Sequence, residues 1–229
     1  MLQIGCAQPG KPVIAERSPV LSGENRRSYV VQPGDTLYSI AWRFELDHQG
    51  LARANSIRSP YTIYPGQSLR LVVQLPTGSR VSESSTASAK QAPKRTAAPR
   101  PAAPAATRET DLRWVWPLRV PPSRNFGGAS KGMDFRLSAA TDTARAAAAG
   151  EVVYAGTGIG GFERLVIIKH NRALLSAYSF DGALKVREQQ QVDSGRAIAE
   201  IRRRGPAQQA LHFELRRDGK PINPRQYLR

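Results

Sequence analysis

A stretch dominated by Pro, Ala and Ser divides this chain of 229 residues and limits how it can fold. Residues 74 to 112 include the run APKRTAAPRPAAPAAT and contain almost no large apolar side chains. Such a composition buries too little apolar surface to offset the loss of chain entropy, and it favours an extended, semi-stiff chain. We therefore predict a disordered linker between a small module at residues 29 to 73 and a larger domain at residues 113 to 229. Residues 1 to 28 show no clear periodicity and are predicted to be an N-terminal extension.

The formal net charge of +16 is concentrated in the larger domain. Residues 113 to 229 hold 20 Lys and Arg against 10 Asp and Glu, and the densest basic run is Arg202-Arg203-Arg204. A basic surface suits nucleic acid, acidic cell-wall polymers or acidic lipid headgroups. Because no nucleic-acid-binding motif accompanies the run, we predict no nucleic-acid partner. An ordinary solvated basic face is the other interpretation.

Cys6 is the only cysteine, so the sequence excludes an internal disulfide. The run Leu2-Gln3-Ile4-Gly5-Cys6 resembles the end of a lipoprotein signal, in which the cysteine carries the lipid. The residues before Cys6 leave no room for the charged and apolar regions of such a signal. We therefore expect a start upstream of Met1 and a lipid anchor at Cys6, with a plain thiol as the alternative.

The segment Ala210-Leu211-His212-Phe213-Glu214-Leu215 alternates small or polar residues with large apolar ones. This period of two predicts a half-buried strand with His212 and Glu214 on one face. A His-x-His pair on such a strand would direct two imidazoles into one groove, where one could bind zinc. The first position of that pair is Ala210, so the sequence predicts a site that has lost part of its chemistry.

Six segments of the larger domain occur in the order of a known domain family. They are Trp114-Val115-Trp116-Pro117, Ser130-Lys131-Gly132-Met133-Asp134-Phe135, Ala146 to Gly156, Leu165 to His170, Leu175 to Tyr178, and Leu211-His212-Phe213-Glu214 followed by Asn223-Pro224. Together they resemble the lysostaphin/LytM-type zinc endopeptidase domain, a mainly-β family of peptidoglycan hydrolases.

The resemblance also assigns the family's functional positions to residues of this chain. Its zinc ligands correspond to Ser130, Asp134 and His212, and its two catalytic histidines to Phe180 and Ala210. The family needs four histidines in this domain, whereas the whole chain has three. A catalytic zinc site normally has three protein ligands, so we predict no bound metal, no cofactor and no catalysis. A zinc-dependent peptidoglycan endopeptidase with atypical ligands is the alternative.

The resemblance further implies that these positions line one groove that binds a partner protein. The predicted groove residues are Ser130, Asp134, Tyr178, Phe180, Ala210 and His212. Replacing imidazoles by Phe180 and Ala210 predicts a more apolar cleft, which suits an amphipathic helix.

The small module has a βααβ pattern. Residues 29 to 31 predict a strand, Gln32-Pro33-Gly34 a turn, and Asp35 or Thr36 the cap of a first helix. A second short helix is expected to end near Asn55, and a closing strand runs from residue 68 to residue 72. The apolar positions of the first helix are Leu37, Ile40, Ala41 and Phe44.

This pattern, with Val31 to Leu37 and Ile63 to Leu69, closely resembles a LysM module, a family that binds glycans such as peptidoglycan. The family places the sugar between the loop that opens the first helix and the loop before the last strand. The implied glycan-binding residues are Gly34, Asp35, Thr36, Leu37, Ile57, Ile63 and Tyr64. Backbone N–H groups at a helix start suit acetamido carbonyls, and apolar side chains suit the sugar's CH face. The alternative is that some of these residues are core.

The combination of a LysM module, a Pro/Ala-rich linker and a degenerate LytM domain resembles the NlpD-type murein hydrolase activators. Leu175 to Tyr178 followed by Val186 to Gln190 supports that subgroup. The resemblance implies a non-catalytic protein that binds peptidoglycan and activates a periplasmic N-acetylmuramoyl-L-alanine amidase through its groove, in cell-wall remodelling and daughter-cell separation. It also implies a periplasmic location, with an outer-membrane lipid anchor if the start lies upstream. A purely structural wall-binding protein remains as a further alternative.

Overall fold

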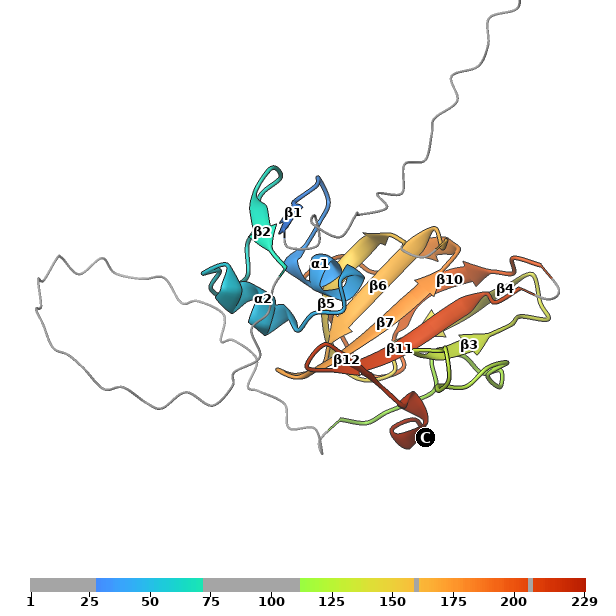
Figure 1. The fold of residues 1–229 in the computed structure, drawn as a ribbon. Helices are drawn as coiled ribbons and strands as arrows, with labels where there is room; N and C mark the ends of the chain where they lie inside the picture. The colour runs from blue at the N-terminus through green and yellow to red at the C-terminus, as the bar shows by residue number, and fades with distance from the viewer. Residues whose placement is uncertain (1–27, 72–111, 159–160, 206–207) are drawn as a thin grey trace, which may run out of the picture.

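The computed structural model describes residues 28–71, 112–158, 161–205 and 208–229 (Figure 1). Cys6, residues 1–27 of the expected extension, residues 72–73 of the expected small module and residues 74–111 of the expected linker lie outside the described residues. Within the described ranges, no helix is long and apolar enough to cross a membrane.

The N-terminal module has the predicted βααβ order. Strand β1 (Ser28–Val30) pairs antiparallel with β2 (Ser68–Arg70), and helices α1 (Leu37–Arg43) and α2 (His48–Ala54) lie between them in sequence. The side chains of Leu37, Ile40 and Ala41 from α1 pack with those of Leu51 and Leu69 in one small core. The fold expected of a LysM module is therefore confirmed.

Helix α1 begins where its capping residues satisfy the free backbone N–H groups. The Thr36 hydroxyl accepts a hydrogen bond from the Ser39 N–H at 3.1 Å, and the Ser39 hydroxyl accepts one from the Thr36 N–H at 3.0 Å. This reciprocal capping box assigns the cap to Thr36. The chain reaches it through a turn at Gly34, whose φ of 84° favours glycine.

The C-terminal domain is mainly β. Its larger sheet has the order β12-β11-β7-β6-β5-β9, with β3 paired to β11, and its smaller sheet has the order β4-β10-β8. A short 3-10 helix, η3 (Pro224–Gln226), follows β12. The strands are β3 (Met133–Phe135), β4 (Thr141–Arg145), β5 (Gly150–Thr157), β6 (Arg164–Lys169), β7 (Leu174–Phe180), β8 (Gly182–Leu184), β9 (Gln191–Val192), β10 (Ala197–Arg202), β11 (Leu211–Arg217) and β12 (Lys220–Ile222).

The register of β7 and β11 decides which side chains reach the core. Leu211 lies opposite Phe180 and Phe213 opposite Tyr178, and all four side chains are fully buried in the domain core. Successive residues of a strand point to opposite faces. The other face of the pair therefore carries the even-numbered residues of β11, which are His212, Glu214 and Arg216.

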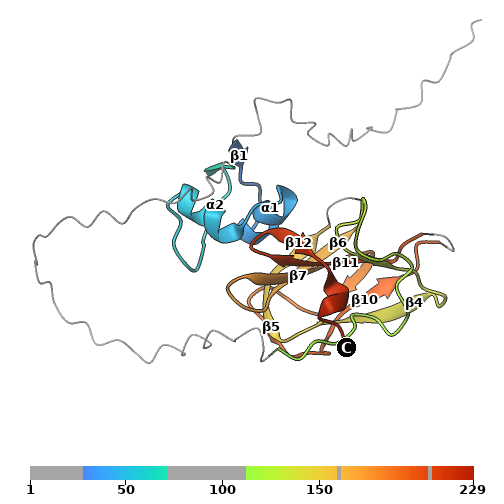
Figure 2. The same cartoon turned by 60° about the horizontal axis from the view of Figure 1, so that its bottom comes forward.

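The LysM module packs against this second face of the sheet (Figures 1 and 2). Tyr38 and Trp42 of α1 are buried in a cluster with sheet residues that include Leu165, Ile167 and Ala177. These two aromatic residues stand four positions apart, so they form a second apolar stripe on a helix whose first stripe fills the module's own core. Helix α1 thus links two hydrophobic cores, which the sequence analysis did not predict.

Polar contacts accompany this packing. The Arg216 guanidinium lies 3.5 Å from the centre of the Trp42 ring and donates to the Trp42 carbonyl at 3.1 Å. Gln49 of α2 donates to the Arg172 carbonyl at 2.6 Å and accepts from its side chain at 2.8 Å. Lys131 forms an ion pair with Glu45. The LysM module and the sheet therefore meet in one continuous interface.

Candidate functional site

Asp134 and His212 meet across neighbouring strands. The two residues lie directly opposite each other in the β3–β11 pair, with His212 Nδ1 2.5 Å from Asp134 Oδ1. Asp134 is 2% exposed, and its other oxygen accepts from Arg124 Nε at 2.5 Å. Of the expected zinc ligands, the fold therefore brings the surviving Asp and His together.

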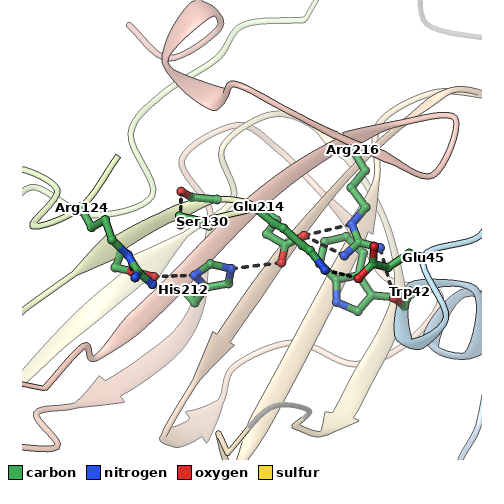
Figure 3. Close-up of polar contacts among 10 residues, drawn as sticks. Trp42, Glu45, Arg124, Ser130, His212, Glu214 and Arg216 are labelled. Atoms are coloured by element: carbon green, nitrogen blue, oxygen red, sulfur yellow. Dashed lines mark hydrogen bonds and ion pairs between the residues drawn. The ribbon is translucent and has the colours of Figure 1, made fainter. Parts of the chain in front are cut away.

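Figure 3 shows that the polar contacts continue along β11 from this pair. The second ring nitrogen of His212 lies 3.0 Å from Glu214 Oε1. The other oxygen of Glu214 accepts from Arg216 Nε at 2.9 Å, and Arg216 in turn contacts Trp42 of the LysM module. Alternating cations and carboxylates thus form a charged line from Arg124 to Arg216.

His212 is held as an imidazolium by this line. Burial opposes a charge on its ring, but hydrogen bonds and charge interactions with Asp134 and Glu214 outweigh burial and raise the pKa of His212 to about 9. Burial likewise opposes a charge on Asp134, but His212 and Arg124 hold the pKa of its carboxyl below the usual value. At neutral pH both ring nitrogens of His212 therefore carry protons that face carboxylates.

These residues do not fit the zinc ion that the LytM-type fold implies. A histidine binds a metal through a free lone pair on its imidazole ring. The protonated His212 lacks such a lone pair. The hydroxyl of Ser130, at the position of the third ligand, donates to the Gly132 carbonyl at 2.9 Å. Within the described ranges, no group of three or more His, Cys, Asp and Glu side chains is arranged to hold a metal ion.

Phe180, Ala210 and Tyr178 do not line a groove, and that part of the prediction is wrong. Phe180 and Ala210 are fully buried in the domain core. Tyr178 is also fully buried, and its hydroxyl accepts from the Ala147 N–H at 2.7 Å. The reason is the strand register, because Ser179 rather than Phe180 lies opposite His212.

The cavity beside Asp134 is polar and basic, so the expected apolar cleft is also wrong. It has a volume of about 480 Å³. Oriented with its amide nitrogen toward Asp134, Gln209 donates to both carboxylate oxygens at 3.1 and 3.2 Å. The lining residues are Ser123, Arg124, Asp134, Arg136, Arg204, Gln208 and Gln209. We call this the Asp134 cavity.

The three arginines of the Asp134 cavity have different surroundings. Arg124 is paired with Asp134, and Arg204 is paired with Asp181 at 2.8 Å. Arg136 is exposed and forms no ion pair with any described residue. The basic run Arg202-Arg203-Arg204 is evident in the sequence, but no sequence pattern places Arg204 beside Asp134.

The predicted glycan-binding residues fall into two groups. Leu37 is 1% exposed in the LysM core, Thr36 caps α1, and Asp35 accepts hydrogen bonds from the Tyr29 hydroxyl and the Gln32 N–H. Ile57 and Ile63 are partly buried against the same core. By contrast, Tyr64 is 68% exposed, and the space above Gly34 is open. Tyr64 and Gly34 are thus the most accessible of the predicted residues.

The chain matches the LysM domain over residues 29–72 and Peptidase family M23 over residues 128–224. The Lipoprotein NlpD/LppB homolog of Pseudomonas aeruginosa is 39% identical over 95% of this chain and 80% of its own length. The Murein hydrolase activator NlpD of Escherichia coli K12 is 33% identical over 88% of this chain and 67% of its own length. Among solved structures, the peptidase lysostaphin of Staphylococcus simulans matches with a TM-score of 0.42 and 19% identity, over 47% of this chain and 48% of lysostaphin. Because the chain is similar to these relatives over most of its length, it belongs to the NlpD/LppB family, with a LysM domain followed by an M23-type domain.

Proposed function

We propose that this protein is a non-catalytic activator of a periplasmic N-acetylmuramoyl-L-alanine amidase. The observation that carries the proposal is the pairing of His212 with both Asp134 and Glu214. This pairing uses both nitrogens of the surviving histidine of the peptidase site, so the site has no free ligand set for metal-assisted hydrolysis. Relatives named murein hydrolase activators support the activating role.

The Asp134 cavity is the surface that we assign to the amidase. Arg136 and the other arginines there offer several N–H donors, which bind carboxylates in paired geometry. We therefore propose that the amidase inserts an acidic side chain, rather than the apolar helix face expected from the sequence. Binding would activate the amidase by favouring the state whose active site is open.

The LysM module supplies the contact with peptidoglycan in this proposal. Tyr64 presents an exposed aromatic ring, which suits the CH face of a sugar, and Gly34 leaves room for a glycan beside the start of α1. Relatives named lipoproteins support a location in the cell envelope. Anchoring to the outer membrane through Cys6 is part of the same proposal.

The test is stimulation of the cognate amidase by purified full-length variants. Arg136→Glu reverses the charge of an exposed side chain that forms no described ion pair, so it should fold normally. We expect stimulation to fall at least about tenfold, as for the loss of one charge-assisted contact. Arg187→Glu is the matched control, because Arg187 is exposed and lies outside the Asp134 cavity. Equal stimulation by both variants would contradict this surface.

A further inference from the structure

A second, larger cavity is lined by the same chain segment that borders the Asp134 cavity. Ser123 and Arg124 face the Asp134 cavity, whereas residues 118–122 line the second cavity, which has a volume of about 820 Å³. Its other walls come from Val115 and Trp116, from Asn125, from β4, from the turn at Gly195 and from the C-terminal residues after β12. Figures 1 and 2 show the C-terminal turn beside the segment that opens the domain, away from α1 and α2.

The second cavity combines an apolar wall with a basic rim. Its apolar lining residues are Val115, Trp116, Leu118, Val120, Pro121 and Pro122. Its charged lining residues are Arg119, Arg145, Arg225 and Arg229, and no Asp or Glu of the described ranges lines it. The ligand that fits such a site is an anion with apolar groups between its charges.

The arginines of this cavity lack the ion pairs that several other arginines of the protein form. Arg43, Arg53, Arg202 and Arg204 each form an ion pair with a carboxylate. No described carboxylate lies within ion-pair distance of any of the four arginines of the second cavity. Their charge is therefore left available to a ligand.

Internal hydrogen bonds orient two of these guanidinium groups. Arg145 donates to the Gly195 carbonyl at 3.1 Å, and Arg225 donates to the Asn125 side chain at 3.4 Å. A guanidinium has five N–H donors, so each keeps further donors for a ligand. Such prior orientation lowers the entropy cost of binding an anion.

We propose that this cavity binds a short peptide that carries several carboxylates, the chemistry of the stem peptide of murein. The carboxylates would meet the arginines, while methyl and methylene groups between them would contact Trp116 and Leu118. A lipid surface fits less well, because the large apolar side chains that the described residues expose are Val30 and Tyr64, both in the LysM module. This inference rests on the proposed function at murein, and it adds a peptide contact to the glycan contact.

The test is isothermal titration calorimetry of the full-length protein with the tripeptide alanine, γ-linked glutamate and diaminopimelate. We expect saturable binding by the unchanged protein. In Arg119→Glu/Arg225→Glu the dissociation constant should rise at least about tenfold, because two exposed positive charges are reversed. The control pair Arg164→Glu/Arg187→Glu makes the same change of charge on exposed residues outside the cavity and should bind normally.

Three results would overturn the proposal. The first is no binding by the unchanged protein, or equal binding by both double variants once circular dichroism shows that they fold. The second is equal binding of the tripeptide with its carboxylates converted to carboxamides, or equally strong competition by inorganic phosphate. The third is loss of binding in Arg136→Glu, which would place the peptide in the Asp134 cavity. Stimulation of the amidase is a separate readout, so failure of the proposed function would leave the titration interpretable.

Discussion

The two faces of the β7–β11 strand pair carry opposite chemistry. One face presents Phe213 and Phe180 to a closely packed core, and the other presents His212, Glu214 and Arg216 as a line of paired charges. Both faces come from the same strands, in which neighbouring residues alternate sides. The core face can therefore maintain the fold independently of the side chains on the other face. Changes on one face should test folding, and changes on the other should test binding.

The largest expected effect is on the core face. Phe180→Glu would place a carboxylate opposite Leu211 in the core with no partner, which costs several kcal/mol and should unfold the domain. Ser179→Ala, at the adjacent position on the other face, should lower the free energy of unfolding by less than about 1 kcal/mol. Circular dichroism and urea denaturation measure both effects. A folded, stable Phe180→Glu protein would contradict the assigned register.

A smaller effect is expected at the two ends of the charged line. Arg216 is 3% exposed, so Arg216→Ala would leave Glu214 buried without that partner and should cost about 3 kcal/mol. The side chain of Arg124 is 57% exposed, and Arg124→Ala should cost less than about 1 kcal/mol. Urea denaturation compares the two variants. Similar losses would show that the line is equally solvated at both ends.

His170 provides a test that depends on pH. Burial lowers the pKa of His170 to about 4, although its hydrogen bond to the Ala149 carbonyl opposes the shift. The folded pKa lies below the unfolded value of about 6.5, so this contribution to stability is complete above pH 6.5 and is lost as pH falls toward 4.

The variant His170→Gln isolates this contribution. From pH 7.5 to pH 5, the unchanged protein should lose about 2 kcal/mol more unfolding free energy than the variant, since the linkage slope is about 1.4 kcal/mol per pH unit. Urea titrations at both pH values measure the difference. Parallel pH profiles would show that His170 is not buried in its neutral form.

The smallest effect concerns the accessible residues of the LysM module. Tyr64→Ala should weaken sedimentation with purified sacculi about fivefold, as for the loss of one aromatic contact worth about 1 kcal/mol. Val30→Ala is the matched control, because Val30 is the other exposed large apolar residue of the module. If the Val30 variant loses as much binding as the Tyr64 variant, the glycan contact does not lie at the predicted loops.

Local sequence patterns predicted the elements but not every partner of their side chains. The spacing of Leu37, Ile40 and Ala41 correctly predicted α1 and its core face. The same spacing places Tyr38 and Trp42 on another face, yet it cannot reveal that a sheet far along the chain covers them. Periodicity identifies buried positions, whereas the covering surface depends on tertiary packing.

The candidate site shows the same limit. The motif placed Asp134 and His212 at one site, and the strand register brings them together. The motif also assigned Phe180 to that site, but the direction of a side chain near a strand end depends on register, which a single sequence does not specify. Arg136 and Arg204 lie in segments separated by many residues, so their meeting beside Asp134 had no sequence signal.

The central claim is that the M23-type domain contacts a partner instead of cleaving peptidoglycan. Release of dye from labelled sacculi tests this claim most directly, with the protein alone in added Zn²⁺ and with its cognate amidase. We predict no release by the protein alone and at least about tenfold more release with the amidase than the amidase gives by itself. Release by the protein alone that Asp134→Ala abolishes would contradict the account.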